Sequence, residues 1–178
     1  MGFGSGAVCS IHLNSTLTAA EQARYQDTAV IQRLLGESRT IAVVGLSADR
    51  QKASFFVASY LRSEGYRVVP VNPRGGEILG ETVYSDLESV PFAIDIVDVF
   101  RPSGEALGIA EQAVRVKARA LWLQLRIIDT AAAELALAAG LSVVVDRCIK
   151  MEHGRFCGGL HAAGMNTEIV TARRPRSR

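Results

Sequence analysis

The segment of residues 41–61, IAVVGLSADRQKASFFVASYL, is the most informative part of the chain. Its first four residues form an uninterrupted apolar run, which is typical of a strand buried on both faces. The run ends at Gly45-Leu46-Ser47, and a helical pattern begins near Ala53. A strand, a glycine turn and a helix N-terminus in this order begin a phosphate-binding loop. The later glycines of the dinucleotide motif G-x-G-x-x-G are missing, so this segment alone does not identify a ligand.

The same alternation of strands and helices continues along the chain. Strands separated by helices of about ten residues indicate βαβ units and a parallel sheet. We therefore predict an α/β fold, a single doubly wound, Rossmann-like and mostly parallel sheet with flanking helices. The predicted strands are 41–44, 66–73, 95–100, 120–125 and 141–146, and the predicted helices are 18–35, 53–63, 103–117 and 130–139.

The length of 178 residues predicts one domain with a single core. Thr18 and Glu21 have the spacing of a capping box and mark the first helix. We expect a flexible leader over residues 1–17, a folded domain over 18–153 that includes an N-terminal helix at 18–36, and a C-terminal extension over 154–178. That extension ends in a basic tail, which we interpret as a solubilising end.

Composition argues against several classes of partner. A net charge of +2 is too small to indicate nucleic-acid binding by itself. The sequence has no apolar stretch of about 18 residues, so we expect no membrane segment. Three cysteines at irregular spacing do not suggest a disulfide framework, and no secretory signal is evident. These features predict a cytoplasmic protein.

Polar and basic side chains follow the predicted strands, where a sheet of this kind binds its ligand. An NAD site requires an acidic residue after the second strand, but the sequence there is Asn72-Pro73-Arg74. An arginine suits a phosphorylated ribose, so NAD is disfavoured. NADP and a ligand with a ribose 3′-phosphate both stay open. Ser47 and Ser54 add hydroxyl donors near the next helix N-terminus.

Five stretches together resemble one known family. They are IAVVGLSAD (41–49), GYRVVPVNPRGGEILGETVYSDLESVP (65–91), DIVDVFRP (95–102), ALWLQL (120–125) and VVVDRCIKMEH (143–153). This pattern is similar to the bacterial CoA-binding Rossmann-fold proteins of the YccU type, and more distantly to the CoA-binding domain of succinyl-CoA synthetase α-subunits. The resemblance implies coenzyme A bound across the strand ends of a small cytoplasmic protein with no established reaction.

The same resemblance implies a set of cofactor-binding residues in three loops. The first loop contributes Gly45, Ser47, Lys52 and Ser54 to the phosphate region. The second contributes Asn72, Pro73 and Arg74 at the nucleotide end. The third contributes Phe100, Arg101 and Pro102 beside the path of the pantetheine arm.

No catalytic constellation is evident. There is no G-x-S-x-G elbow. Asp95 and Asp98 are three apart in a predicted strand and should point to opposite faces. We expect Asp98 to pair with a loop N–H or an arginine, and Trp122 and Phe100 to form core or pocket wall. These features favour a CoA-binding or regulatory module over an enzyme. The alternative is an NADP-linked oxidoreductase or a nucleotide-binding subunit of a larger enzyme.

The cysteines and histidines near the C-terminus do not predict a metal site. Cys148, His153, Cys157 and His161 have suitable ligand types. Their register would need a helix, which glycines at 154, 158 and 159 oppose. Separately, Arg147 and Lys150 flank Cys148 and would lower the pKa of its thiol, which raises the possibility of a mixed disulfide with CoA. An inert, half-buried cysteine is the competing interpretation.

Overall fold

The computed structural model of the protein describes residues 16–157. Five parallel strands form the central sheet in the order β2-β1-β5-β6-β7, and a short antiparallel hairpin of β3 and β4 follows β2. The strands are β1 (Thr40–Val44), β2 (Arg67–Val71), β3 (Glu77–Ile78), β4 (Glu81–Thr82), β5 (Ile96–Val99), β6 (Ala120–Leu123) and β7 (Ser142–Val144). The helices are α1 (Ala19–Tyr25), α2 (Thr28–Glu37), α3 (Ala53–Ser63), α4 (Ser103–Arg115), α5 (Thr130–Ala138) and α6 (Ile149–Phe156).

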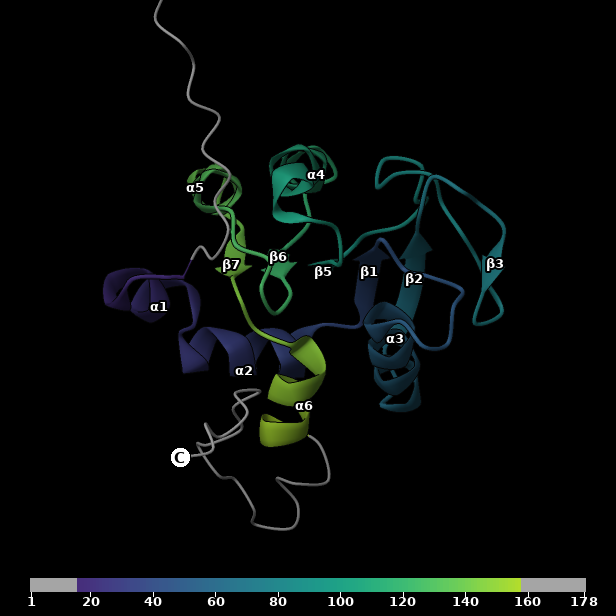
Figure 1. The fold of residues 1–178 in the computed structure, drawn as a ribbon, viewed down its shortest axis with the longest axis horizontal. Coiled ribbons are helices and arrows are strands. Elements are labelled where there is room, and N and C mark those ends of the chain that lie inside the picture. The colour runs from purple at the N-terminus through teal and green to yellow at the C-terminus, as the bar shows by residue number, and fades with distance from the viewer. Residues whose placement is uncertain (1–15, 158–178) are drawn as a thin grey trace, which may run out of the picture.

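The chain winds in two directions from β1. β2 pairs with one edge of β1 and β5 with the other, so the strand order reverses between β1 and β5. Helices α4 and α5 cover one face of the sheet, and α2, α3 and α6 cover the other (Figure 1). This arrangement confirms the predicted Rossmann-like α/β fold. It also places the carboxyl ends of β1, β2 and β5 around one crevice, the usual ligand position in such sheets.

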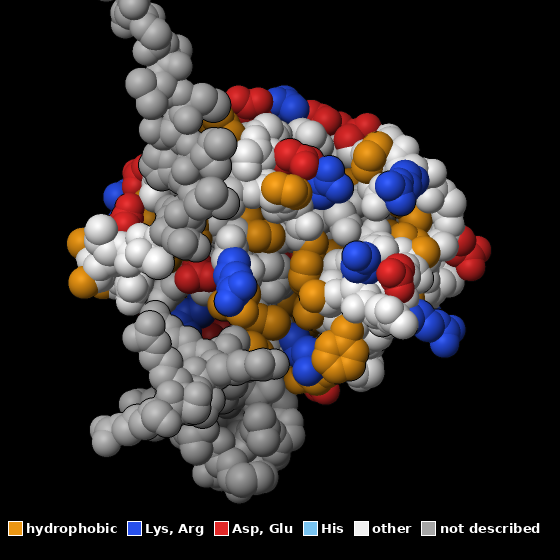
Figure 2. Space-filling model, viewed as in Figure 1, with side chains coloured by type: hydrophobic (Ala, Val, Ile, Leu, Met, Phe, Trp, Pro, Cys, Tyr) orange, Lys and Arg blue, Asp and Glu red, His pale blue; other side chains and the backbone are white. Residues whose placement is uncertain are grey.

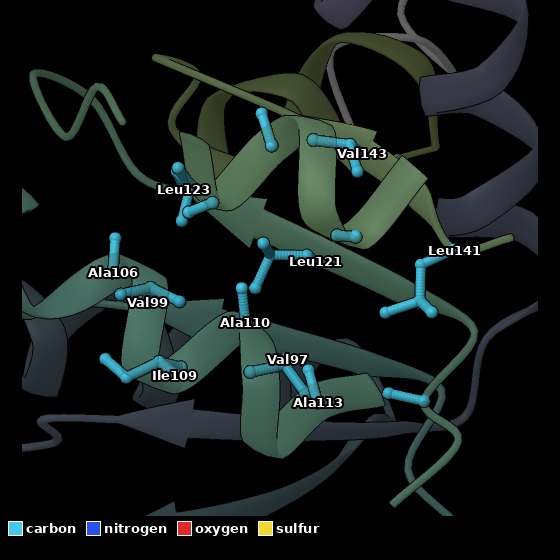
Figure 3. Packing of buried hydrophobic residues seen from close by; sticks show 14 of the residues in the cluster. Val97, Val99, Ala106, Ile109, Ala110, Ala113, Leu121, Leu123, Leu141 and Val143 are labelled. Carbon is cyan, nitrogen blue, oxygen red and sulfur yellow. The ribbon is translucent and has the colours of Figure 1, made fainter. Parts of the chain in front are cut away.

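Each face of the sheet has its own apolar core. On one face, Val97 and Val99 of β5 and Leu121 and Leu123 of β6 meet α4 and α5 (Figure 3). The inner side of α4 is built from small residues, which lets the helix lie close to the strands. These residues are Ala106, Ala110 and Ala113, all fully buried. The second core lies between the sheet and α2, α3 and α6. The strands are therefore buried on both sides, as their continuous apolar runs predicted.

The predicted helix at 18–35 was wrong in its continuity, because the structure has two helices there. The capping box is present: Thr18 Oγ1 accepts from the Glu21 N–H at 3.3 Å, and Glu21 Oε2 accepts from the Thr18 N–H at 2.7 Å. Asp27 then caps a new helix by accepting from the Val30 N–H at 3.0 Å. That side-chain bond competes with helix continuation. The second helix also runs past Gly36 to Glu37.

Helix α6 differs from the expectation, because the glycines at 154, 158 and 159 argue against a helix after Cys148. The structure forms it through Gly154. One internal glycine costs about 1 kcal/mol, and buried contacts outweigh that cost. His153 is buried between aromatic rings: its Nδ1 lies 2.9 Å from Tyr60 Oη, and it meets Tyr60 and Tyr66 edge-on. The helix also runs through residue 153, the expected end of the folded domain.

None of the helices within residues 16–157 is long and apolar enough to cross a membrane.

Candidate functional site

A cavity of about 560 Å³ lies at the carboxyl ends of β1, β2 and β5. The structure brings together in its wall all the expected site residues except Pro102, which is the N-cap of α4. Ala53 is a lining residue that sequence reasoning missed. The full lining is Gly45, Ser47, Lys52, Ala53, Ser54, Asn72, Pro73, Arg74, Phe100 and Arg101.

Gly45 permits the first loop to pass close to the third. Its φ is +87°, in the left-handed region that favours glycine. Its N–H donates to the Val71 carbonyl oxygen at 2.8 Å. A Cβ at this position would lie 2.7 Å from Arg101 Cδ and 3.2 Å from the Phe100 carbonyl oxygen. The glycine therefore serves both the turn and the close approach of the Arg101 stem.

The Gly45→Ala variant should lose about 1 to 3 kcal/mol of stability, from backbone strain together with displacement of Arg101. Denaturant unfolding measures this loss. Gly140→Ala is the matched control, because Gly140 has the same φ of +87° but nothing within 4 Å of its Cβ position. The control should show the strain alone. If the two variants lose equal stability, the contact with Arg101 has no energetic weight.

Two serine hydroxyls face the cavity with a hydrogen left to donate. Ser54 Oγ accepts from the Ser47 N–H at 3.2 Å, and Ser47 Oγ accepts from the Asp49 N–H at 3.1 Å. A hydroxyl that accepts a hydrogen bond can still donate one. Ser54 is buried, so its hydroxyl is held in place by its surroundings. Both side chains can therefore offer O–H groups to an anionic ligand.

The N-terminus of α3 opens into the cavity without a cap from its own chain. α1, α2 and α5 are capped by the side chains of Thr18, Asp27 and Asp129. At α3 the N-cap is Lys52, whose side chain makes no capping hydrogen bond within residues 16–157, and the same holds for Pro102 at α4 and Cys148 at α6. The first N–H groups of a helix need partners, and the helix dipole makes this end positive. The site therefore presents backbone N–H groups, with the Lys52 ammonium beside them.

Asn72 ties the first loop to the second. Its Nδ2 donates to the Leu46 carbonyl oxygen at 3.0 Å, and its Oδ1 accepts from the Arg74 N–H at 3.0 Å. The amide is thus engaged within the chain, although it also lines the cavity. Its observed contacts are structural, and sequence reasoning did not foresee them. The exposed Arg74 side chain forms no ion pair with a carboxylate within residues 16–157.

Arg101 is paired within its own loop and helix. Its Nε donates to Glu105 Oε2 at 2.8 Å, and its Nη2 donates to Glu105 Oε1 at 2.9 Å. This hydrogen-bonded pair raises the pKa of Arg101 further above its ordinary value. Sequence reasoning missed Glu105, although the i, i+4 spacing of opposite charges at the start of a helix is a usable signal.

Asp98 lies on β5 and is fully buried. Gln124 Nε2 donates to its Oδ1 at 2.7 Å, and its Oδ2 has no hydrogen-bond partner among residues 16–157. Burial raises the pKa of Asp98 to about 8. The expected pairing with a loop N–H or an arginine was wrong. The partner is the side-chain amide of Gln124, in the loop between β6 and α5.

Asp95 has the opposite environment at the start of β5. Its Oδ2 accepts from the N–H groups of Arg39 and Thr40 at 2.8 and 2.9 Å, and its Oδ1 lies 3.6 Å from Arg119 Nη1. Burial opposes ionisation, but these bonds and the nearby charge outweigh it and lower the pKa of Asp95. The two aspartates therefore have separate structural settings.

The thiol of Cys148 is less acidic than the sequence suggested. Burial is the main cause that raises the pKa of Cys148, and it outweighs the backbone N–H groups of Met151 and Lys150, which act to lower that pKa. A raised pKa disfavours the reactive thiolate, which contradicts the lowering expected from Arg147 and Lys150 and favours the competing interpretation of an inert cysteine. Within residues 16–157 no three His, Cys, Asp or Glu side chains are placed to hold a metal ion. His161 of the candidate metal set lies outside the described residues.

The two aromatic side chains have the expected positions. Trp122 is fully buried in the core, and its Nε1 donates to the Arg147 carbonyl oxygen at 2.7 Å. Phe100 lines the cavity. On the face drawn in Figure 2, lysine and arginine side chains stand singly among acidic and apolar ones. The coloured part of that face therefore has no continuous basic stripe of the kind that tracks a nucleic-acid backbone.

Residues 39–154 match the sequence model of a family described as CoA binding domain. The chain belongs to this CoA-binding domain family. The matched residues run from the start of β1 into α6 and include every lining residue of the cavity. The membership therefore covers the whole sheet and the crevice at its strand ends.

Relatives of this family cover most of the chain. The uncharacterized protein YneT of Bacillus subtilis is 37% identical over 125 residues, which is 70% of this chain and 93% of YneT. A solved structure of a hypothetical protein from Pyrococcus horikoshii is 34% identical with a TM-score of 0.72, covering 74% of this chain and 92% of that one. A solved structure from Thermus thermophilus is 35% identical with a TM-score of 0.70. The match covers 73% of this chain and 98% of that one.

A larger protein contains a similar unit. The dinucleotide-forming acetyl-coenzyme A synthetase 1 of Ca. Korarchaeum cryptofilum is 26% identical with a TM-score of 0.55. The match covers 65% of this chain but 28% of the synthetase chain. The CoA-binding domain fold described here thus resembles one part of a much longer enzyme.

Proposed function

We propose that the protein binds coenzyme A, free or as an acyl thioester, in the cavity at the ends of β1, β2 and β5. The observation that carries this proposal is the uncapped N-terminus of α3, which opens into the cavity beside Lys52. Such a helix end with a cation beside it binds phosphate through backbone N–H groups and the dipole. Membership in the CoA-binding domain family selects CoA among phosphorylated ligands.

The distribution of charge gives the ligand a direction in the cavity. Lys52 and Arg74 are exposed cations in the walls formed by the first and second loops. We assign the pyrophosphate to the α3 N-terminus with Ser47 and Ser54, and a ribose phosphate to Arg74, which can bind it with two N–H groups. Phe100 then lines the path of the pantetheine arm along the third loop.

We infer further that the protein is a binding or regulatory module of the YccU type, acting in the cytoplasm. The resemblance to a unit of the acetyl-coenzyme A synthetase supports a second candidate, a CoA-binding subunit of a larger enzyme. In both cases the module supplies ligand binding. A second protein that co-purifies with the full chain would favour the subunit.

CoA should raise the melting temperature of the protein, because it binds the native state and not the unfolded chain. At about one hundred times its Kd the expected shift is about 5 to 10 °C. Thermal unfolding with CoA, dephospho-CoA, NAD and NADP, each at the same concentration, checks this. CoA should give the largest shift, and dephospho-CoA a smaller one because it lacks the ribose phosphate. A larger shift with NADP than with CoA would overturn the proposal in favour of an NADP-linked protein.

A further inference from the structure

The third loop presents a cation whose charge is already balanced. Both Nε and Nη2 of Arg101 are bonded to the two carboxylate oxygens of Glu105. The stem of Arg101 is also held in place, because its Cδ and Cγ occupy the space that a Cβ on Gly45 would need. The guanidinium is thereby fixed in the cavity wall by contacts at both ends. The net charge of the Arg101–Glu105 pair is zero, and Arg101 lines the third-loop wall along which we have proposed that the arm of the ligand runs.

The other walls of the cavity differ in charge. Neither Lys52 nor Arg74 forms an ion pair with a carboxylate within residues 16–157. The cavity wall therefore carries two cations without a carboxylate partner among the described residues, on the first two loops, and one balanced cation, Arg101, on the third loop. An elongated ligand with phosphates at one end and an uncharged arm at the other matches this pattern.

We propose that the Arg101–Glu105 pair makes the site selective for CoA or the thioester of an uncharged acyl group, against thioesters whose acyl group ends in a carboxylate. This inference rests on the proposed function and names the class of ligand that the same cavity takes. Glu105 acts as a specificity-determining residue, since it sets the charge that the far end of the ligand meets.

The physical reason is the competition for one guanidinium. A carboxylate at the end of the acyl group would be repelled by Glu105, and it would have to displace Glu105 to reach Nε and Nη2 of Arg101. An uncharged thioester has no such conflict. Its carbonyl oxygen can accept from the Nη1 group of Arg101, which the bond to Glu105 leaves available.

The test is isothermal titration of the full chain with three probes, CoA, acetyl-CoA and succinyl-CoA. For the wild type the Kd of succinyl-CoA should be at least about fivefold above that of acetyl-CoA, the size expected for one repulsive pair near the surface. In Glu105→Gln the Arg101 charge is released, and the ratio of the two Kd values should fall to about one or below. Glu111→Gln is the control, because Glu111 is an exposed carboxylate on the same helix, and it should keep the wild-type ratio.

The outcomes separate this inference from the proposed function. If both thioesters bind the wild type equally, the selectivity is absent and the inference falls while CoA binding stands. If the wild type discriminates and Glu105→Gln discriminates as strongly, the pair does not cause the selectivity and the inference is overturned. If none of the three probes binds, the proposed function fails and the inference falls with it. Thermal unfolding of Glu105→Gln confirms that the variant is folded at the temperature of titration.

Discussion

The Asp98→Asn variant should be more stable than the wild type by about 2 to 4 kcal/mol at pH 8, because it avoids a proton uptake that costs about 5 kcal/mol and leaves an amide N–H unpaired at a cost of about 1 to 3 kcal/mol. Asp98 is fully buried, and burial raises its pKa in the folded protein to about 8. The unfolded chain binds this proton with an ordinary aspartate pKa of about 4. Folding at neutral pH therefore requires uptake of a proton, which costs free energy. Asparagine keeps an oxygen for the Gln124 amide and removes that cost.

The sign of the pH dependence follows from the same shift. Because the folded pKa of Asp98 is raised, the contribution of this group to stability is fully present below about pH 4 and decreases as the pH rises toward 8. The advantage of the variant should thus grow by about 2 kcal/mol between pH 6 and pH 8. Denaturant unfolding of both proteins at these two pH values measures the difference. The buried His153 titrates in both proteins and cancels in the comparison.

Asp95→Asn provides the matched control, since the pKa of Asp95 is lowered and not raised. Its carboxylate accepts bonds from the backbone of Arg39 and Thr40. That contribution to stability is present at neutral pH and lost as the pH falls, so this variant should be less stable than the wild type. An Asp98→Asn advantage that is the same at pH 6 and pH 8 would show that Asp98 is not a protonated buried acid.

The Arg74→Ala variant should bind CoA about 10- to 100-fold more weakly, a loss of about 1.5 to 3 kcal/mol, as expected for a hydrogen bond to a charged group. The exposed Arg74 side chain lines the cavity, so its removal should leave the fold intact. Calorimetric titration with CoA gives the affinity. The affinity for dephospho-CoA should fall less in the Arg74→Ala variant, because dephospho-CoA lacks the phosphate that we assign to Arg74.

Arg115→Ala is the control for this measurement. Arg115 is an exposed arginine in the last turn of α4 that pairs with Glu88 on the surface. Its removal takes away the same charge without touching the cavity, so CoA affinity should stay within about twofold of the wild type, a change well under 1 kcal/mol. Equal affinities for wild type and Arg74→Ala would remove Arg74 from the site.

The sheet could be predicted because its strands are apolar runs that end at glycine, proline or polar residues. α3 has the predicted bounds, Ala53 to Ser63, since its local pattern and its packing agree. α6 could not be predicted in this way, because its helix depends on contacts of His153 with Tyr60 and Tyr66. Local glycine signals argued against a helix that tertiary burial stabilises.

In the candidate site, too, local sequence patterns predicted some features, and others depend on tertiary contacts. The strand-end rule predicted where a ligand site would lie, and the family resemblance indicated the residues, of which all but Pro102 line the cavity wall. The partners of those residues were harder to predict. The amide of Gln124 reaches Asp98 across 26 positions of sequence, and no local pattern encodes that pair. Asn72 lines the cavity as expected, and the use of its amide to connect two loops had no local sequence signal.

The two hydrogen bonds of Asn72 make the first and second loops one mechanical unit. Leu46 belongs to the loop after β1 and Arg74 to the loop after β2, and one side chain holds both. An engineer who exchanged either loop alone for that of a relative would break one of these bonds and shift the other loop. Changing the ligand of this scaffold therefore requires that the two loops be transplanted as a matched pair, with their connecting asparagine.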